Sequence, residues 1–129
     1  MKSRVGQLCI NVTDLERSTR FYCEAMGLNL EQRFEIPDAS EVLLGSPDSD
    51  GKLQLAQQKS QKGPINHGDA LYKMYIYTDN VQAAYDAAMA FGGCTSKMAP
   101  QYLDEWKVTL AFITDPDGYT VEIVQRKDA

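Results

Sequence analysis

The chain begins with alternating apolar and polar residues and then changes to a helical period. Leu8, Ile10 and Val12 share one face of a predicted strand. Asp14 follows as a helix-capping residue, and Gly27 suits the far end of the same helix. Between them, the residues that recur at helical spacing are Leu15, Ser18, Tyr22, Ala25 and Met26. The pattern predicts a strand followed by an amphipathic helix.

The same succession of patterns returns at an offset of 66 residues. The segment "QLCINVTDLERSTRFYCEAMGL" aligns with "KMYIYTDNVQAAYDAAMAFGG", so that Gln7 matches Lys73 and Gly27 matches Gly93. In the second copy Asn80 takes the capping position. The stripe of the second predicted helix consists of Val81, Ala84, Tyr85, Ala88 and Phe91. Self-similarity at a fixed offset indicates a duplicated structural unit.

Three strand-like segments complete each half. They are "NLEQRFEI", "SEVLLGS" and "GKLQLAQ" in the first half, and "TSKMAP", "WKVTLAFITD" and "GYTVEIVQ" in the second. The turns "PDSDG" and "DPDG" favour hairpins and an antiparallel or mixed sheet. Since a half of about 60 residues is marginal alone, we expect a shared core. The prediction is an α+β fold in one domain, residues 1–129, with module 1 at about 4–58 and module 2 at about 70–126.

Composition and charge limit which binding partners and which cellular compartment we expect. The chain has 129 residues, of which 43% are hydrophobic and 24% charged. It lacks a signal peptide and the apolar run of about 20 residues that a membrane span needs. Three cysteines without Cys-x-x-Cys spacing indicate reduced thiols and a cytoplasmic location. The net charge of −5 argues against nucleic acid, and we expect no membrane partner.

The sequence holds one histidine, His67, in the Gly/Pro segment "GPINHGD". A three-histidine zinc site on one chain is therefore excluded. We interpret His67 as a solvated loop residue.

Two segments carry a resemblance to a known family. "VTDLERSTRFYCEAMGL" and "FITDPDGYTVEIVQ", in this order and at this distance, resemble the vicinal oxygen chelate superfamily. Its members include glyoxalase I (lactoylglutathione lyase), bleomycin-resistance proteins and extradiol dioxygenases, and both segments are most similar to the glyoxalase I branch. The resemblance implies two tandem βαβββ modules that form a cupped eight-stranded mixed sheet, often completed as a homodimer.

The resemblance also implies a place for a divalent metal such as Zn²⁺, Ni²⁺ or Mn²⁺. The family's ligand positions correspond here to Gln7, Gln54, Lys73 and Glu122. Gln54 stands where an acid is usual and Lys73 where a histidine is usual. A protonated lysine has no lone pair to donate, and an ammonium repels a dication. We therefore expect no metal cofactor, and we expect Lys73 to pair with Glu122.

Strand alternation predicts which side chains surround this pair. The candidate ligand-binding residues are Gln7, Cys9, Asn11, Gln54, Tyr75 and Tyr77. Further residues expected on this face are Lys52, Ala56, Thr120 and Val124. Amides, two tyrosines and a charge pair suit a small polar or aromatic ligand.

Three functional hypotheses remain open from the sequence. The first is a glyoxalase I-like lyase or isomerase, with Glu122 as the base and Lys73 as a fixed positive charge. The second is a metal-free protein that binds or sequesters a small molecule, as in the bleomycin-resistance type. The third is a metal-free enzyme that forms a Schiff base through Lys73. In each case the expected partners are a small molecule and, in a homodimer, a second copy.

Overall fold

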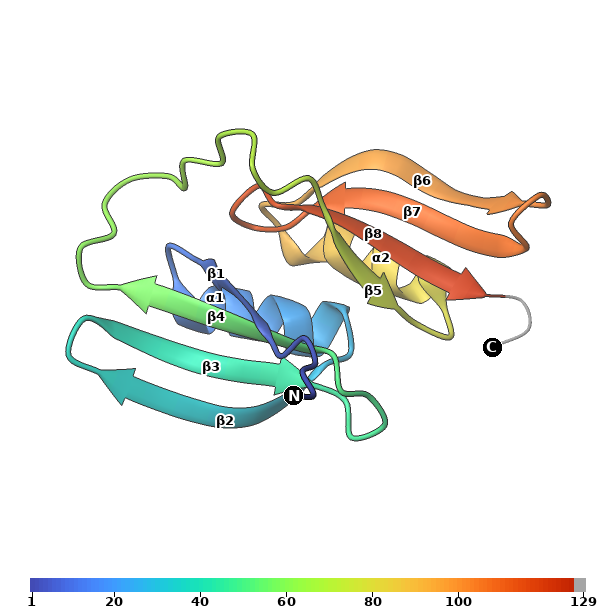
Figure 1. The fold of residues 1–129 in the computed structure, drawn as a ribbon. Helices are drawn as coiled ribbons and strands as arrows, with labels where there is room; N and C mark the ends of the chain where they lie inside the picture. Colours follow the sequence, from blue (N-terminus) through green and yellow to red (C-terminus); the bar gives the residue numbers. More distant parts are fainter. Residues whose placement is uncertain (127–129) are drawn as a thin grey trace.

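Each half of the chain folds as one strand, one helical segment and three further strands, in the order that the sequence patterns predict (Figure 1). The computed structural model describes residues 1–126. Module 1 comprises β1 (Leu8–Asn11), α1 (Leu15–Arg20), the π-helix η1 (Phe21–Ala25), β2 (Asn29–Ile36), β3 (Ala39–Gly45) and β4 (Lys52–Gln58). Module 2 comprises β5 (Met74–Tyr77), α2 (Val81–Phe91), β6 (Thr95–Leu103), β7 (Val108–Thr114) and β8 (Thr120–Arg126).

The strands form two four-stranded mixed sheets, with the orders β1-β4-β3-β2 and β5-β8-β7-β6. β1 runs parallel to β4, and β5 runs parallel to β8, whereas the remaining neighbours are antiparallel. The predicted pair of βαβββ modules is thus confirmed, and the eight strands are divided between two four-stranded sheets within one chain. β1 and β5 are both edge strands, and neither pairs with the other in the part of the chain that the structure describes.

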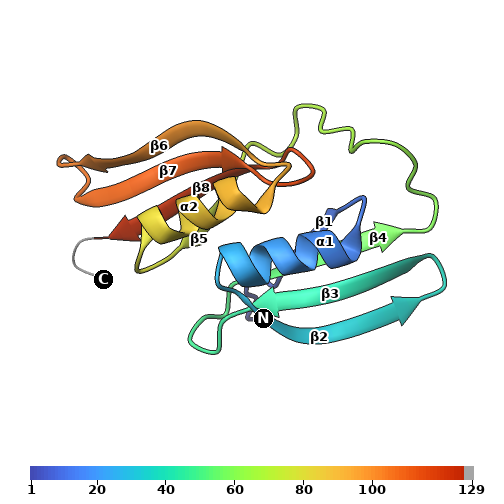
Figure 2. The ribbon, with the colours of Figure 1, turned by 180° about the vertical axis from the view of Figure 1, so that it is seen from behind.

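Both helical segments lie on the same side of the sheets, where they pack against each other (Figure 2). The predicted caps are present: Asp14 accepts a hydrogen bond from the backbone N–H of Arg17, and Asn80 accepts one from Ala83, each at 3.0 Å. The π-helical turn at Phe21 was not predicted. The Phe21 ring is fully buried and meets the Phe91 ring of module 2 edge-on at 5.4 Å. The main apolar core therefore spans both modules, and a smaller cluster around Val108, Leu110 and Val124 lies in module 2.

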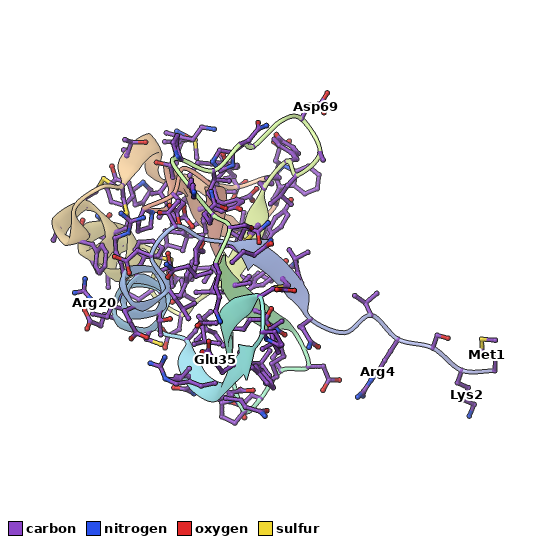
Figure 3. All side chains as sticks on the ribbon, turned by 90° about the vertical axis from the view of Figure 1, so that its left-hand side faces the viewer. Met1, Lys2, Arg4, Arg20, Glu35 and Asp69 are labelled. Atoms are coloured by element: carbon purple, nitrogen blue, oxygen red, sulfur yellow. The ribbon has the colours of Figure 1, made fainter. Side chains whose placement is uncertain are left out.

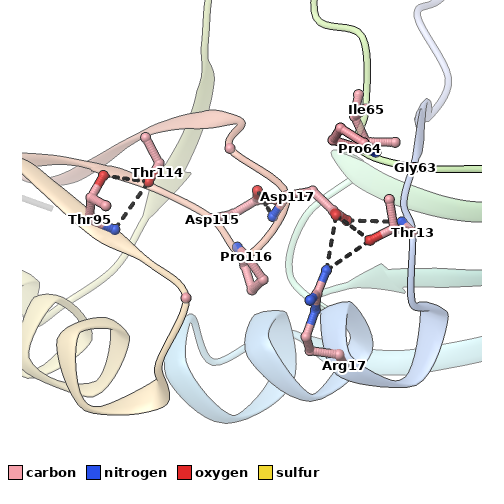
Figure 4. A pocket seen from close by; sticks show the side chains of 12 residues that line it. Thr13, Arg17, Gly63, Pro64, Ile65, Thr95, Thr114, Asp115, Pro116 and Asp117 are labelled. Atoms are coloured by element: carbon pink, nitrogen blue, oxygen red, sulfur yellow. Dashed lines mark hydrogen bonds and ion pairs between the residues drawn. The ribbon is translucent and has the colours of Figure 1, made fainter.

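The turn between β7 and β8 fastens module 2 to the start of α1 (Figure 4). The Asp117 carboxylate accepts hydrogen bonds from Thr13 N (3.1 Å), Thr13 Oγ1 (2.5 Å), Arg17 Nη2 (2.9 Å) and Ser18 Oγ (3.4 Å). These contacts surround one end of an open hollow of about 530 Å³. We call the residues Thr13, Arg17, Asp115 and Asp117 the junction.

Asp115 completes the junction from inside the core. Its carboxylate is fully buried and accepts hydrogen bonds from Tyr22 Oη (2.7 Å) and from the backbone N–H groups of Asp117 and Tyr119 (each 2.9 Å). Burial raises the pKa of Asp115 above its usual value, although these hydrogen bonds act in the opposite direction. The turn sequence "DPDG" is thus a contact between modules as well as a hairpin turn.

His67 is an exposed loop residue, as expected, but it also makes contacts that the sequence did not predict. Its Nε2 donates to the backbone carbonyl of Asp117 at 2.8 Å, and its ring packs edge-on against Tyr119, with centroids 4.7 Å apart. The side chain is exposed, but it attaches the linker between the modules to the junction turn. A single loop histidine carries no sequence signal for such a contact.

The N-terminal residues, including Met1, Lys2 and Arg4, extend away from the body of the molecule ahead of β1 (Figure 3). Among residues 1–126, no helix is both long and apolar enough to span a membrane.

Candidate functional site

The candidate site lies on the side of the two sheets that the helices leave uncovered, which we call the open face. On module 2 it carries the rings of Tyr75 and Tyr77, which are 51% and 61% exposed. The two rings are nearly parallel, at 16°, with centroids 6.4 Å apart. They point to the same face because residues two apart in a strand do so.

The parallel pairing of β5 with β8 places Tyr75 beside Glu122. Lys73 immediately precedes β5, and its Nζ lies 2.6 Å from Glu122 Oε1. Glu122 is only 7% exposed. The Lys73 ammonium also lies over three aromatic rings, with Nζ 4.9 Å from the centroids of Tyr72 and Tyr75 and 5.2 Å from that of Phe112. One carboxylate and three ring faces therefore surround this cation, and each of them favours its charged form.

The hydrogen bond to Glu122 raises the pKa of Lys73 well above its usual value. The amine is consequently protonated at neutral pH and has no lone pair with which to attack a carbonyl. A Schiff-base nucleophile needs a lowered lysine pKa, so this arrangement disfavours the hypothesis of a metal-free Schiff-base enzyme.

Module 1 presents amides on the same open face. Gln7 Nε2 donates to Gln54 Oε1 at 3.0 Å, and Gln54 Nε2 donates in turn to Glu41 Oε1 at 2.9 Å. Nearby, Gln58 Nε2 donates to Asn11 Oδ1 at 2.7 Å. This wall offers hydrogen-bonding groups that are mostly uncharged.

Cys9 lies beside Gln54 in the β1–β4 register and is exposed. Partial burial of its thiol, together with the nearby Glu41, raises the pKa of Cys9. The thiolate, which is the reactive form of cysteine, is therefore disfavoured. Cys9 fits a wall residue of the face and does not fit a nucleophile.

The four positions that the resemblance assigned to a metal form two pairs, Gln7 with Gln54 and Lys73 with Glu122. Within residues 1–126, no hydrogen bond or ion pair joins one pair to the other. The same residues contain no group of three or more histidine, cysteine, aspartate or glutamate side chains that could hold a metal ion. Two amides bonded to each other and one carboxylate bonded to an ammonium do not fit a divalent metal.

Three residues of the site were not predicted from the sequence: Tyr72 and Phe112 beside Lys73, and Arg126 beside Tyr77. Alternation along β7 would have identified Phe112, because that residue stands opposite Glu122 in the β7–β8 register. The guanidinium carbon of Arg126 lies 5.5 Å from the centroid of the Tyr77 ring. Neither Tyr72, which precedes β5, nor Arg126, at the end of β8, had a motif that singled it out.

The sequence and the fold place this chain among known proteins. The sequence model of the Glyoxalase/Bleomycin resistance protein/Dioxygenase superfamily matches residues 4–123, and the chain belongs to that superfamily. A probable lactoylglutathione lyase of Vibrio parahaemolyticus is 31% identical over 98% of this chain and 93% of its own length. The lactoylglutathione lyase of Haemophilus influenzae is 28% identical over 92% of this chain and 89% of its own.

Solved structures of glyoxalase I have a fold similar to that of this chain. Glyoxalase I of Zea mays superposes with a TM-score of 0.83 at 28% identity, over 95% of this chain and 46% of the maize chain. This chain thus spans about half the length of the maize protein. The trypanothione-dependent glyoxalase I of Leishmania major superposes with a TM-score of 0.75 at 28% identity, over 98% of this chain and 89% of its own. The chain is therefore glyoxalase-like in sequence and in fold.

Proposed function

We propose that this glyoxalase-like protein binds a small organic molecule on its open face without a divalent metal. The observation that carries the proposal is the contact of 2.6 Å between Lys73 Nζ and Glu122 Oε1. It brings an ammonium to the place where the resemblance implies a metal. The ammonium would repel a dication placed beside it. The one carboxylate that could bind the dication, that of Glu122, is already paired with Lys73.

The remaining walls of the face suit such a ligand. Tyr75 and Tyr77 supply exposed ring surface, and Gln7, Gln54 and Asn11 supply amide donors and acceptors. Binding sites commonly combine apolar or aromatic surface with a few fixed polar groups. Binding of this kind requires no group to change its protonation state.

A second candidate is a lyase or isomerase, because relatives at about 30% identity are named lactoylglutathione lyase. In that reading Glu122 removes a proton and Lys73 holds the developing negative charge. The short contact between the two residues disfavours it, because the Glu122 oxygen that would take up the proton already accepts a hydrogen bond from the Lys73 ammonium.

The isomerisation of the hemithioacetal of methylglyoxal and glutathione separates these two candidates. We expect no conversion above the uncatalysed rate with the chelator-treated protein, and no increase when Ni²⁺ or Zn²⁺ is added. Conversion that depends on added metal and is lost in Glu122→Gln would contradict the proposal. Matched controls are Glu105→Gln, a charge removal on the β6–β7 turn, and a parallel assay of an active glyoxalase I.

We further propose that the face is completed by a second copy of the chain. β1 and β5 are both edge strands, and an unpaired edge is a template for pairing with another chain. The chain of the maize enzyme is about twice as long as this one, which supports the pairing of two such units. In the proposed homodimer, the Gln7–Gln54 pair of one copy faces the Lys73–Glu122 pair of the other.

Light scattering after size-exclusion chromatography tests the dimer. We expect twice the mass of the chain for the wild type and a single mass for Leu8→Lys, which places a charge on an edge strand at a side chain that is 49% exposed. Trp106→Lys, at a side chain that is 68% exposed on the distant β6–β7 turn, should remain dimeric. A wild-type protein that is monomeric at all concentrations would refute the dimer.

A further inference from the structure

A groove opens between the two modules at the end of β1 that is remote from the junction. Leu8, the first residue of β1, lines this groove, whereas Thr13 of the junction lies beyond the last residue of the strand. The groove has a volume of about 490 Å³. Its floor consists of buried apolar side chains, those of Leu44, Leu53, Met74 and Ile76. A hollow with such a floor favours an apolar occupant.

The free edge of β5 borders the groove with backbone hydrogen-bonding groups. Thr78 N donates to Val124 O of β8 at 2.9 Å. Because neighbouring residues of a strand turn their backbone groups to opposite edges, the N–H and C=O groups of Tyr75 and Tyr77 face away from β8. Both tyrosines line the groove, and within residues 1–126 no strand pairs with this edge. An unpaired edge beside an apolar hollow suits an extended peptide segment.

The N-terminal residues of the chain form an extended segment of this kind. Residues 1–6, which we call the arm, are exposed throughout and extend away from the body of the molecule (Figure 3). Val5 gives the arm an apolar side chain that is 93% exposed. The arm meets the body close to Leu8, at the mouth of the groove, and continues outward. The groove that it can enter without reversing its course is therefore that of a second copy.

The arm and the rim of the groove carry opposite charges. The arm contains Lys2 and Arg4 and no acidic residue. The loop between β3 and β4, residues 46–51, lines the groove, and we call it the rim. It contains Asp48 and Asp50 and no basic residue. Complementary charges of this kind guide two surfaces together and fix their register.

These charges are available for a contact between copies. The ion pairs found within residues 1–126 engage neither the basic residues of the arm nor the acidic residues of the rim. Lys52, which follows the rim, does not offset the rim's charge, because its Nζ lies 2.8 Å from Glu31 Oε2. The rim thus keeps a negative charge next to an apolar groove, and the arm combines positive charge with an apolar side chain.

We propose that two copies of the chain exchange their arms, so that the arm of each copy lies in the groove of the other. Val5 enters the apolar groove, the backbone of the arm pairs with the edge of β5, and the basic residues of the arm meet the acidic residues of the partner's rim. This inference rests on the homodimer of the proposed function and names contacts that hold it together. Since Tyr75 and Tyr77 line the groove, the arm of one copy also borders the open face of the other.

Charge reversal tests the contact between arm and rim. The arm variant is Lys2→Glu with Arg4→Glu, and the rim variant is Asp48→Lys with Asp50→Lys. We expect each to raise the dissociation constant of the dimer at least about tenfold in sedimentation equilibrium at low salt, because an attraction becomes a repulsion at both symmetric contacts. Asp104→Lys, a matched reversal at a side chain that is 87% exposed on the β6–β7 turn, should leave the constant unchanged.

A mixture of the two variants shows whether the contact is made between copies. In a mixed dimer the acidic arm of one variant meets the basic rim of the other, and the unchanged arm meets the unchanged rim. Both contacts are then attractive again. We therefore expect an equimolar mixture to form heterodimers with an affinity close to that of the wild-type dimer. A mixture that stays as dissociated as its components would overturn the exchange.

The outcomes also separate the exchange from the dimer itself. Val5→Asp should raise the dissociation constant at least about tenfold, because it places a charge in the apolar groove, whereas Val5→Ile should keep the wild-type value. A wild-type dimer that is unaffected by the arm variant, the rim variant and Val5→Asp would overturn the exchange and leave the dimer intact. A wild type that is monomeric at all concentrations would refute both.

Discussion

Replacing Asp117 with alanine is expected to lower the free energy of unfolding by about 4 kcal/mol, one of the two largest effects foreseen here. The Asp117 side chain is only 4% exposed and accepts hydrogen bonds from Thr13, Arg17 and Ser18 of the other module. Its removal leaves the Arg17 guanidinium without a counter-ion beside an Nε atom that is already buried without a hydrogen-bond partner. Urea unfolding followed by circular dichroism measures the loss.

Two further variants make the result specific. Asp117→Asn keeps an oxygen for Thr13 but loses the charge, so we expect a loss of about half as much. Asp104→Ala removes a carboxylate from another turn, where the side chain is 87% exposed and lies 3.8 Å from Lys107, and it should cost less than about 0.5 kcal/mol. An equal effect of Asp117→Ala and Asp104→Ala would show that the junction does not hold the modules together.

Replacing Lys73 with histidine is expected to create a metal site. The change removes the ammonium, frees the Glu122 carboxylate and adds an imidazole, which is a good ligand for Ni²⁺ and Zn²⁺. In the proposed dimer, the amide oxygens of Gln7 and Gln54 would face these two groups from the second copy. We expect Ni²⁺ affinity to rise by roughly two orders of magnitude, into the micromolar range, as measured by calorimetry.

Lys97→His is the matched control, because it adds an imidazole to the same module at an exposed position that contacts Thr120 and not Glu122. It should leave the affinity for Ni²⁺ unchanged. The double change Lys73→His with Glu122→Gln should remove the gain, since it takes away the anionic ligand. Failure of Lys73→His to bind metal more tightly than Lys97→His would mean that Lys73 is not what excludes the metal.

Much of the fold was predictable because the spacing of hydrophobic residues and the helix-capping residues can be recognised in short stretches of sequence. Alternation at Leu8, Ile10 and Val12 and the caps at Asp14 and Asn80 were enough to place the first strand and the helices. The π-helical turn at Phe21 was not predictable, because it depends on packing against Phe91 of the other module.

The sequence allowed the Lys73–Glu122 pair to be predicted, but not the way in which the residues of the site are arranged around it. The family resemblance led to the prediction of the Lys73–Glu122 contact. It also implied one cup with four positions together, whereas one chain holds them as two separate pairs. The ring cage around the ammonium depends on Phe112, which comes to Glu122 through the β7–β8 register and not through closeness in sequence. The contact of His67 with Asp117 is likewise set by how the linker returns over the junction.

Calorimetric titration of the chelator-treated wild-type protein with Ni²⁺, Zn²⁺ and Mn²⁺ in turn tests directly whether the open face works without a metal. We expect no stoichiometric binding at micromolar concentrations for any of the three, because the Lys73 ammonium already lies 2.6 Å from the Glu122 carboxylate. Stoichiometric binding at micromolar or lower concentration, lost in Glu122→Gln, would contradict the proposed function and would show that Glu122 holds a metal despite Lys73.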